Sequence, residues 1–144
     1  MFSVHYERKA QFYETDAMGI VHHTNYIRWF EEARCAFMDK LGFSYRRCMD
    51  MGIDIALLGV SCEYKSMVRF ADVVDIESHM TDYSETRMTV AYTVTDIQTG
   101  RLCTLGQTRH CFLSRSKGRP VSIRRELPAL HEAFAAYTAQ APRV

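Results

Sequence analysis

Residues 24–41 predict one long helix that must be buried on most of its circumference. At about 100° per residue, the charged side chains Arg28, Glu32 and Asp39 fall within one narrow stripe. A wide apolar arc covers most of the remaining circumference and consists of Tyr26, Ile27, Trp29, Phe30, Ala33, Phe37, Met38 and Leu41. Because so little of this helix is polar, other parts of the chain must cover it on several sides.

Both ends of this helix carry boundary signals in the sequence. Thr24 or Asn25 is suited to cap its start, because short polar side chains accept hydrogen bonds from the first free N–H groups. Gly42 stands directly after the last apolar position, where a left-handed backbone commonly ends a helix.

Four segments after the helix alternate between apolar and polar residues, which is typical of β-strands. The clearest is residues 87–94, in which Met88, Val90, Tyr92 and Val94 share one face. The other expected elements are strands at 2–13, 56–68, 73–83 and 101–115, and a short helix at 127–137. This order predicts an α+β fold in which a curved antiparallel five-stranded sheet wraps around one long central helix.

Length and charge limit the classes of protein to consider. With 144 residues, 47% of them hydrophobic and 24% charged, the chain is expected to form a single domain spanning residues 1–144. Its 18 basic and 17 acidic residues give a net charge of +1, which argues against binding nucleic acid or a membrane surface through bulk charge. The open edges of the sheet predict a homodimer or homotetramer.

The sequence also favours a cytoplasmic location. The first residues, MFSVHYERKAQF, lack the apolar core of a signal peptide, and the longest apolar run, IALLGV, is too short to span a bilayer. The five cysteines are odd in number and contain no CxxC pair. We therefore expect reduced thiols in a soluble cytoplasmic protein, and no metal site.

The segment FYETDAMGIVHHTNYIRWFEEAR, residues 12–34, contains the residues best suited to chemistry. Asp16 lies between a strand and the helix, and Gly19 allows a close approach of backbone to a ligand. His22 and His23 stand just before the helix, whose first turn presents unpaired N–H groups and a partial positive charge. A substrate carbonyl could be polarised there while Asp16 attacks its carbon or activates a water.

Taken singly, each of these residues also has a structural interpretation. Asp16 can be a turn former before a glycine. His22 and His23 can be a solvated loop and a capping side chain, and adjacent histidines are poorly spaced for a metal site. Glu31 and Arg34 can pair along the helix surface.

Taken together, the run YETDAMGIVHHTNYIRWFEEAR resembles the signature of the hotdog-fold acyl-CoA thioesterases of the 4-hydroxybenzoyl-CoA thioesterase family, including the branch associated with the Tol-Pal system. The pattern D-x-x-G-[VI]-V-x-x-x-x-Y followed by F-E-x-A-R carries this resemblance. A second segment, YKSMVRFADVVDI, is similar to a strand pair of the same family. The element order agrees over the whole chain.

The resemblance implies a catalytic role for Asp16, as nucleophile or general base, and for His23, whose backbone N–H would polarise the thioester carbonyl. It implies no cofactor, since coenzyme A is part of the acyl-CoA substrate. The remaining positions of the motif would form the substrate site: Gly19, Val21, His22, Tyr26 and Glu31. The chain departs from the family where Met18 replaces a small residue, where Met67 replaces a proline, and where His22 replaces an aromatic residue.

Two other functions remain open from the sequence. A hotdog dehydratase would pair His23 with an acid on the helix such as Glu31, although the chain lacks the GHFP pattern of that class. A non-catalytic acyl-CoA binding or assembly module would keep the fold without turnover. The acyl group is also open, as is the choice of CoA phosphate ligands among Lys65, Arg69, Arg115, Lys117 and Arg119.

Overall fold

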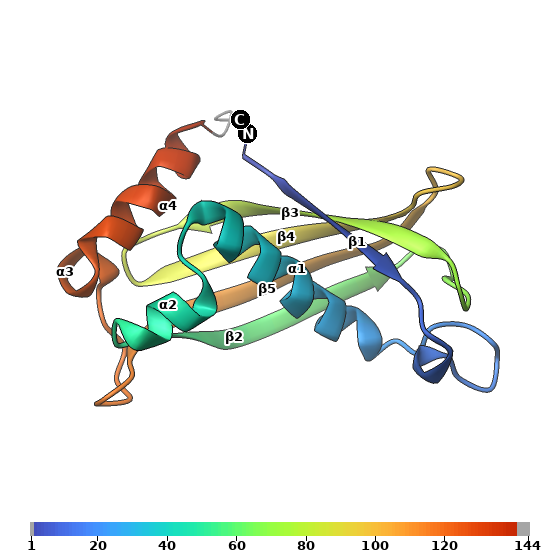
Figure 1. The fold of residues 1–144 in the computed structure, drawn as a ribbon, viewed down its shortest axis with the longest axis horizontal. Helices are drawn as coiled ribbons and strands as arrows, with labels where there is room; N and C mark the ends of the chain where they lie inside the picture. Colours follow the sequence, from blue (N-terminus) through green and yellow to red (C-terminus); the bar gives the residue numbers. More distant parts are fainter. Residues whose placement is uncertain (1, 141–144) are drawn as a thin grey trace.

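We describe the protein from a computed structural model that covers residues 2–140 (Figure 1). The strands are β1 (Val4–Lys9), β2 (Ile53–Tyr64), β3 (Val73–Tyr83), β4 (Arg87–Asp96) and β5 (Leu102–Ser114). The helices are η1 (Phe12–Glu14), α1 (Asn25–Leu41), α2 (Tyr45–Asp50), α3 (Ile123–Glu126) and α4 (Pro128–Gln140). Within the described residues, no helix is both long enough and apolar enough to cross a membrane.

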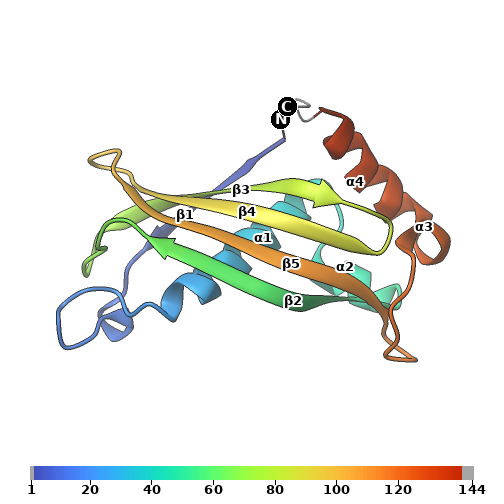
Figure 2. The same ribbon diagram turned by 180° about the vertical axis from the view of Figure 1, so that it is seen from behind.

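The five strands form one antiparallel sheet in the order β1-β3-β4-β5-β2. The sheet curves around α1, which lies along its inner face, and Figure 2 shows the opposite face without a covering helix. This arrangement is the expected hotdog fold. In β4, Met88, Val90, Tyr92 and Val94 are all buried, as the alternation in the sequence predicted.

Helix α1 fills the space inside the sheet because its apolar side chains point in nearly every direction. Trp29, Phe30 and Phe37 are completely buried, and Arg28 and Asp39 are exposed. The helix ends at Gly42, which has φ 90°, as expected for a left-handed cap. At the other end, Thr24 precedes the helix, but its side chain makes no capping hydrogen bond.

Several expectations about local structure are wrong, including the strand expected at 56–68, which is β2 and runs over Ile53–Tyr64. The first strand ends at Lys9 rather than at residue 13, because the chain turns into the short helix η1. Ile27 does not contribute to the buried arc, since 40% of its surface is exposed. Arg34 does not pair with Glu31; it is turned into the core, and Glu31 is exposed.

Arg34 belongs to a group of polar side chains buried between α1 and the sheet. Its Nε donates to the Tyr45 hydroxyl at 2.6 Å, and its Nη1 donates to the Tyr92 hydroxyl at 3.1 Å. The Thr108 hydroxyl lies 2.7 Å from the Tyr92 hydroxyl and 2.8 Å from Nε2 of His110. These bonds satisfy polar groups that would otherwise be costly to bury.

Gly106 of β5 packs directly against Phe30 of α1. The ring of Phe30 lies directly over it, so a Cβ at this position would overlap the ring. Phe30 is buried and stacks on Tyr92 with ring centroids 4.5 Å apart, so the ring has little room to move. We expect Gly106→Ala to lower the free energy of unfolding by about 1–3 kcal/mol, measured by urea denaturation.

Gly59→Ala is the matched control for this prediction. Gly59 also lies in a paired strand, but the group that a Cβ would meet there is the guanidinium of Arg109. Since that group is the far end of a flexible side chain, it can move aside at little cost. Equal destabilisation by the two variants would contradict the close packing of Phe30 on Gly106.

Candidate active site

The loop between η1 and α1 is held in shape by its own backbone hydrogen bonds. The N–H of Asp16 donates to the carbonyl of Ile20 at 2.9 Å, and the N–H of Gly19 donates to the carbonyl of Asp16 at 2.9 Å. Gly19 has φ 76°, a conformation that residues with a side chain rarely adopt. The N–H of Val21 then donates to the carbonyl of Val68 at 2.8 Å, which attaches the loop to the β2–β3 connection.

The carboxylate of Asp16 is half-buried, and one of its oxygens is engaged. Oδ1 accepts a hydrogen bond from the backbone N–H of Met18 at 2.8 Å, which is the turn-forming contact expected of an aspartate here. Within residues 2–140, Oδ2 has no hydrogen-bond partner. Asp16 therefore forms the turn and still presents a free oxygen.

The start of α1 presents a free donor. The N–H of Asn25 donates to the carbonyl of His22 at 3.0 Å, and the carbonyl of His23 accepts from the Tyr64 hydroxyl at 3.1 Å. Among the described residues, no hydrogen bond uses the backbone N–H of His23. The rings of His22 and His23 stack with centroids 4.1 Å apart.

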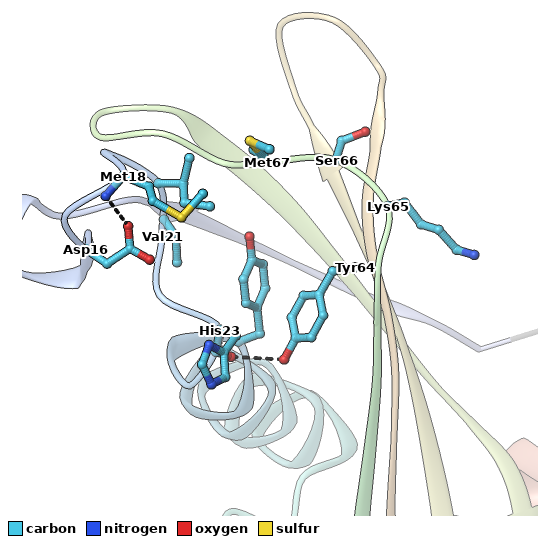
Figure 3. A pocket seen from close by; sticks show the side chains of 10 residues that line it. Asp16, Met18, Val21, His23, Tyr64, Lys65, Ser66 and Met67 are labelled. Carbon is cyan, nitrogen blue, oxygen red and sulfur yellow. Dashed lines mark hydrogen bonds between the residues drawn. The ribbon is translucent and has the colours of Figure 1, made fainter.

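These groups meet at a pocket of about 370 Å³ (Figure 3). The pocket lies between the loop, the start of α1 and the chain that follows β2. It is lined by Asp16, Met18, Ile20, Val21, His23, Tyr26, Tyr64, Lys65, Ser66 and Met67. Its volume lies within the range of small-molecule sites. Burial raises the pKa of Tyr26 and that of Tyr64 to about 12, so both phenols are neutral near pH 7.

The structure brings together only part of the site inferred from the sequence. Asp16, Val21, His23 and Tyr26 line the pocket. The other three residues do not line it: Gly19 shapes the loop, His22 stacks behind His23, and Glu31 is exposed on α1. Of the three residues that depart from the family pattern, Met18 and Met67 line the pocket and His22 does not.

Sequence reasoning missed the part played by residues 64–67. Tyr64 donates to the carbonyl of His23, and Ser66 and Met67 line the pocket beside it. The tyrosine that leads the segment YKSMV was the available signal. Of the five basic residues considered for CoA, only Lys65 lines the pocket, and its side chain points away from Asp16 in Figure 3. Arg115 instead contacts Asp54 at 2.8 Å.

The free groups at this pocket are suited to polarise a carbonyl group and to attack it. A helix N-terminus with a free N–H stabilises negative charge on a carbonyl oxygen. A carboxylate with one free oxygen can attack the carbonyl carbon or remove a proton from water. Within the described residues, no three His, Cys, Asp or Glu side chains are grouped closely enough to hold a metal ion.

Comparison with known proteins agrees with this description. Residues 10–134 match the model of the thioesterase-like superfamily. An Aquifex aeolicus protein named "Putative esterase" is 41% identical over 124 residues, which cover 85% of this chain and 92% of that protein. The Bacillus subtilis protein named "Putative acyl-CoA thioesterase YneP" is 26% identical over 128 residues, with coverage of 89% and 92%.

Among solved structures, that of DHNA-CoA thioesterase from Staphylococcus aureus is similar over the whole chain. It superposes with a TM-score of 0.92 at 30% identity, covering 100% of this chain and 98% of that one. The fold, the pocket and these relatives define an enzyme of the thioester hydrolase class. The chain belongs to the thioesterase-like superfamily.

Proposed function

We propose that the protein hydrolyses acyl-CoA thioesters at the Asp16 pocket. The observation that carries the proposal is that a free carboxylate oxygen of Asp16 and the free N–H of His23 belong to residues lining one pocket. The similarity of this chain to proteins named as CoA thioesterases supports acyl-CoA thioesters as the substrate class. The reaction needs no cofactor, because coenzyme A enters as part of the substrate.

In the proposed reaction, the carbonyl oxygen of the thioester accepts a hydrogen bond from the His23 N–H. If Asp16 is the nucleophile, its carboxylate attacks the carbonyl carbon, the C–S bond breaks, and the CoA thiolate leaves. Water then hydrolyses the resulting anhydride to the free acid and restores Asp16. If Asp16 is the general base, it removes a proton from the water that attacks the carbonyl carbon, and the C–S bond then breaks to release the free acid and the CoA thiolate. A thiolate is a stable enough leaving group for either route.

The pocket supports an apolar acyl group. Met18, Met67 and the rings of Tyr26 and Tyr64 provide an adaptable surface, since methionine side chains adjust to the shape of a ligand. Lys65, at the pocket, is the best placed of the basic residues for a CoA phosphate. A dehydratase of this fold would need His23 and Glu31 in one site. Glu31 is exposed and does not line the pocket that contains His23, which argues against that alternative.

Release of free thiol from a panel of short, long and aromatic acyl-CoAs tests this function. We expect turnover of at least one class, and the panel then ranks the acyl groups. Absence of release across the panel would contradict the proposal. If acyl-CoA binding were still detected in that case, the chain would be the non-catalytic binding module.

We also propose that two copies pair through the edge strand β2, as a dimer or within a tetramer. β2 has 12 residues, lies at the edge of the sheet, and exposes Leu57, Leu58 and Val60. Long apolar edge strands in native proteins are usually covered. We expect light scattering after size-exclusion chromatography to give at least twice the 16.7 kDa chain mass, and a stable monomer would contradict this prediction.

The five free thiols are consistent with a reducing compartment, so we propose a cytoplasmic location for the enzyme.

A further inference from the structure

Glu14 carries a buried carboxylate two residues before Asp16. Only 3% of its surface is exposed, and each of its oxygens accepts two hydrogen bonds. Oε1 accepts from the backbone N–H of Gln11 at 2.8 Å and from Nη1 of Arg8 at 3.0 Å. Oε2 accepts from Nε1 of Trp29 at 2.8 Å and from Nη2 of Arg8 at 3.1 Å. One side chain therefore links β1, η1 and the second turn of α1.

The backbone of Glu14 adds a second connection to the site. Its carbonyl accepts from the N–H of His22 at 2.8 Å and from the side-chain amide of Asn25 at 2.8 Å. These two bonds join the start of the Asp16 loop to its end and to the first turn of α1. Glu14 is thus attached to both components of the site, the acid-bearing loop and the helix N-terminus.

Apart from Val21, which is buried at the end of the loop that leads into α1, the loop has little apolar packing to hold it in place. Met18 is 69% exposed, and the neighbouring Phe12 and Tyr13 of η1 are 75% and 78% exposed. The buried polar contacts that fix the loop relative to α1 are therefore concentrated at Glu14. Catalysis is sensitive to such geometry, because misplacement of a reacting group by about 1 Å can cost about 100-fold in rate.

We infer that Glu14 is a positioning residue for the reaction: through its bond to Trp29 it sets the place of Asp16 relative to the N-terminus of α1. Glu14 touches no substrate and acts through the loop. This inference rests on the proposed function, since it assigns a catalytic consequence to the position of Asp16.

The charge of Glu14 is needed for this role. A carboxylate accepts from all four donors, whereas the amide of a glutamine would turn its own NH₂ group toward two of them. Glu14→Gln keeps the size of the side chain and disrupts two of the four bonds. Trp29→Phe removes one donor and keeps an aromatic ring in the core, so it carries the test if Glu14→Gln does not fold.

Glu32→Gln is the matched control. Glu32 shares the partner Arg8 with Glu14. Its Oε1 accepts from the Tyr6 hydroxyl at 2.7 Å and from Nε of Arg8 at 2.9 Å. Among the described residues, it makes no hydrogen bond with the loop. If the loss of any carboxylate bonded to Arg8 were enough to disturb the site, Glu32→Gln would show the same effect as Glu14→Gln.

The experiment measures two quantities for each full-length variant: hydrogen exchange of the Asp16, Val21 and His22 amides, and kcat and KM for the best acyl-CoA of the panel. In Glu14→Gln and Trp29→Phe we expect exchange of these amides to rise at least about tenfold, and kcat to fall about 10- to 100-fold with little change in KM. Glu32→Gln should leave both quantities near those of the unmodified protein. Trp29 is the single tryptophan, so its indole N–H signal in an NMR spectrum reports directly whether the bond to Glu14 is lost.

The outcomes separate this inference from the proposed function. Unchanged loop exchange in Glu14→Gln and Trp29→Phe would overturn the inference, whatever the activity. Faster loop exchange with unchanged kcat would overturn it too, because Glu14 would then be structural only. If the unmodified protein released no thiol, the proposed function would fail and the catalytic role of Glu14 would fail with it, while the exchange data would still show whether Glu14 holds the loop.

Discussion

Asp16→Asn is expected to lower kcat for thiol release by at least about 100-fold. Asparagine has nearly the same size and keeps a carbonyl oxygen that can accept from the N–H of Met18, so the turn is preserved. The substitution removes only the negative charge. The variant therefore separates the catalytic interpretation of Asp16 from the turn-forming one, which predicts no loss.

Asp72→Asn provides the control for this prediction. Oδ2 of Asp72 accepts from the backbone N–H of Arg69 at 2.9 Å, so this aspartate also forms a turn, but it does not line the pocket. We expect its kcat to match that of the unmodified protein. If Asp16→Asn retained full turnover, Asp16 would be a turn former and the proposed mechanism would be wrong.

The fold could be predicted from the sequence because its strongest signals are local. The bounds of α1 follow from apolar spacing over residues 24–41 and from Gly42, and the structure places the helix at Asn25–Leu41. The burial of Met88, Val90, Tyr92 and Val94 follows from alternation in one strand. Both kinds of signal depend only on the periodicity of neighbouring residues.

Two of the wrong expectations concern contacts that the spacing of residues along one helix does not specify. Helical spacing places Glu31 near Arg34, but Arg34 turns inward to the hydroxyls of Tyr45 and Tyr92, the latter 58 residues away. Ile27 belongs to the apolar arc by spacing alone, yet 40% of its surface stays exposed. Spacing along one helix cannot reveal which of its faces another element reaches.

Contacts between distant residues also determine the part of the site that the motif does not reveal. Asp16 and His23 stand in one recognisable motif, so the sequence could single them out. The contribution of Tyr64 depends on a hydrogen bond to the carbonyl of His23, 41 residues away. The four acceptor bonds of Glu14 likewise depend on how β1 and α1 pack, and nothing in the motif indicates that this glutamate is buried.

A second large effect is expected from pH, through His110 in the core. Burial and, to a lesser degree, the positive charge of Arg34 lower the pKa of His110 to about 4, from an ordinary value of 6.5. The unfolded chain therefore binds a proton between pH 6.5 and pH 4 that the folded protein does not bind. By linkage, the free energy of unfolding should fall across this window by up to about 3 kcal/mol, with no further loss from this group below it.

The contribution of His110 can be isolated by comparison with His110→Gln. Glutamine does not titrate, and its amide can still reach the Thr108 hydroxyl, which His110 Nε2 contacts at 2.8 Å. Carboxylates also titrate in this window, while His5, whose hydrogen bond to Asp75 raises its pKa, adds stability as the pH falls through the range just above 6.5. These groups are common to both proteins, so they cancel in the difference. In urea denaturation from pH 7 to pH 4, the free energy of unfolding of the unmodified protein should fall by up to about 3 kcal/mol more than that of His110→Gln. Parallel curves would mean that His110 is protonated inside the folded core, and that Thr108 and its neighbours rearrange to accept the charge beside Arg34.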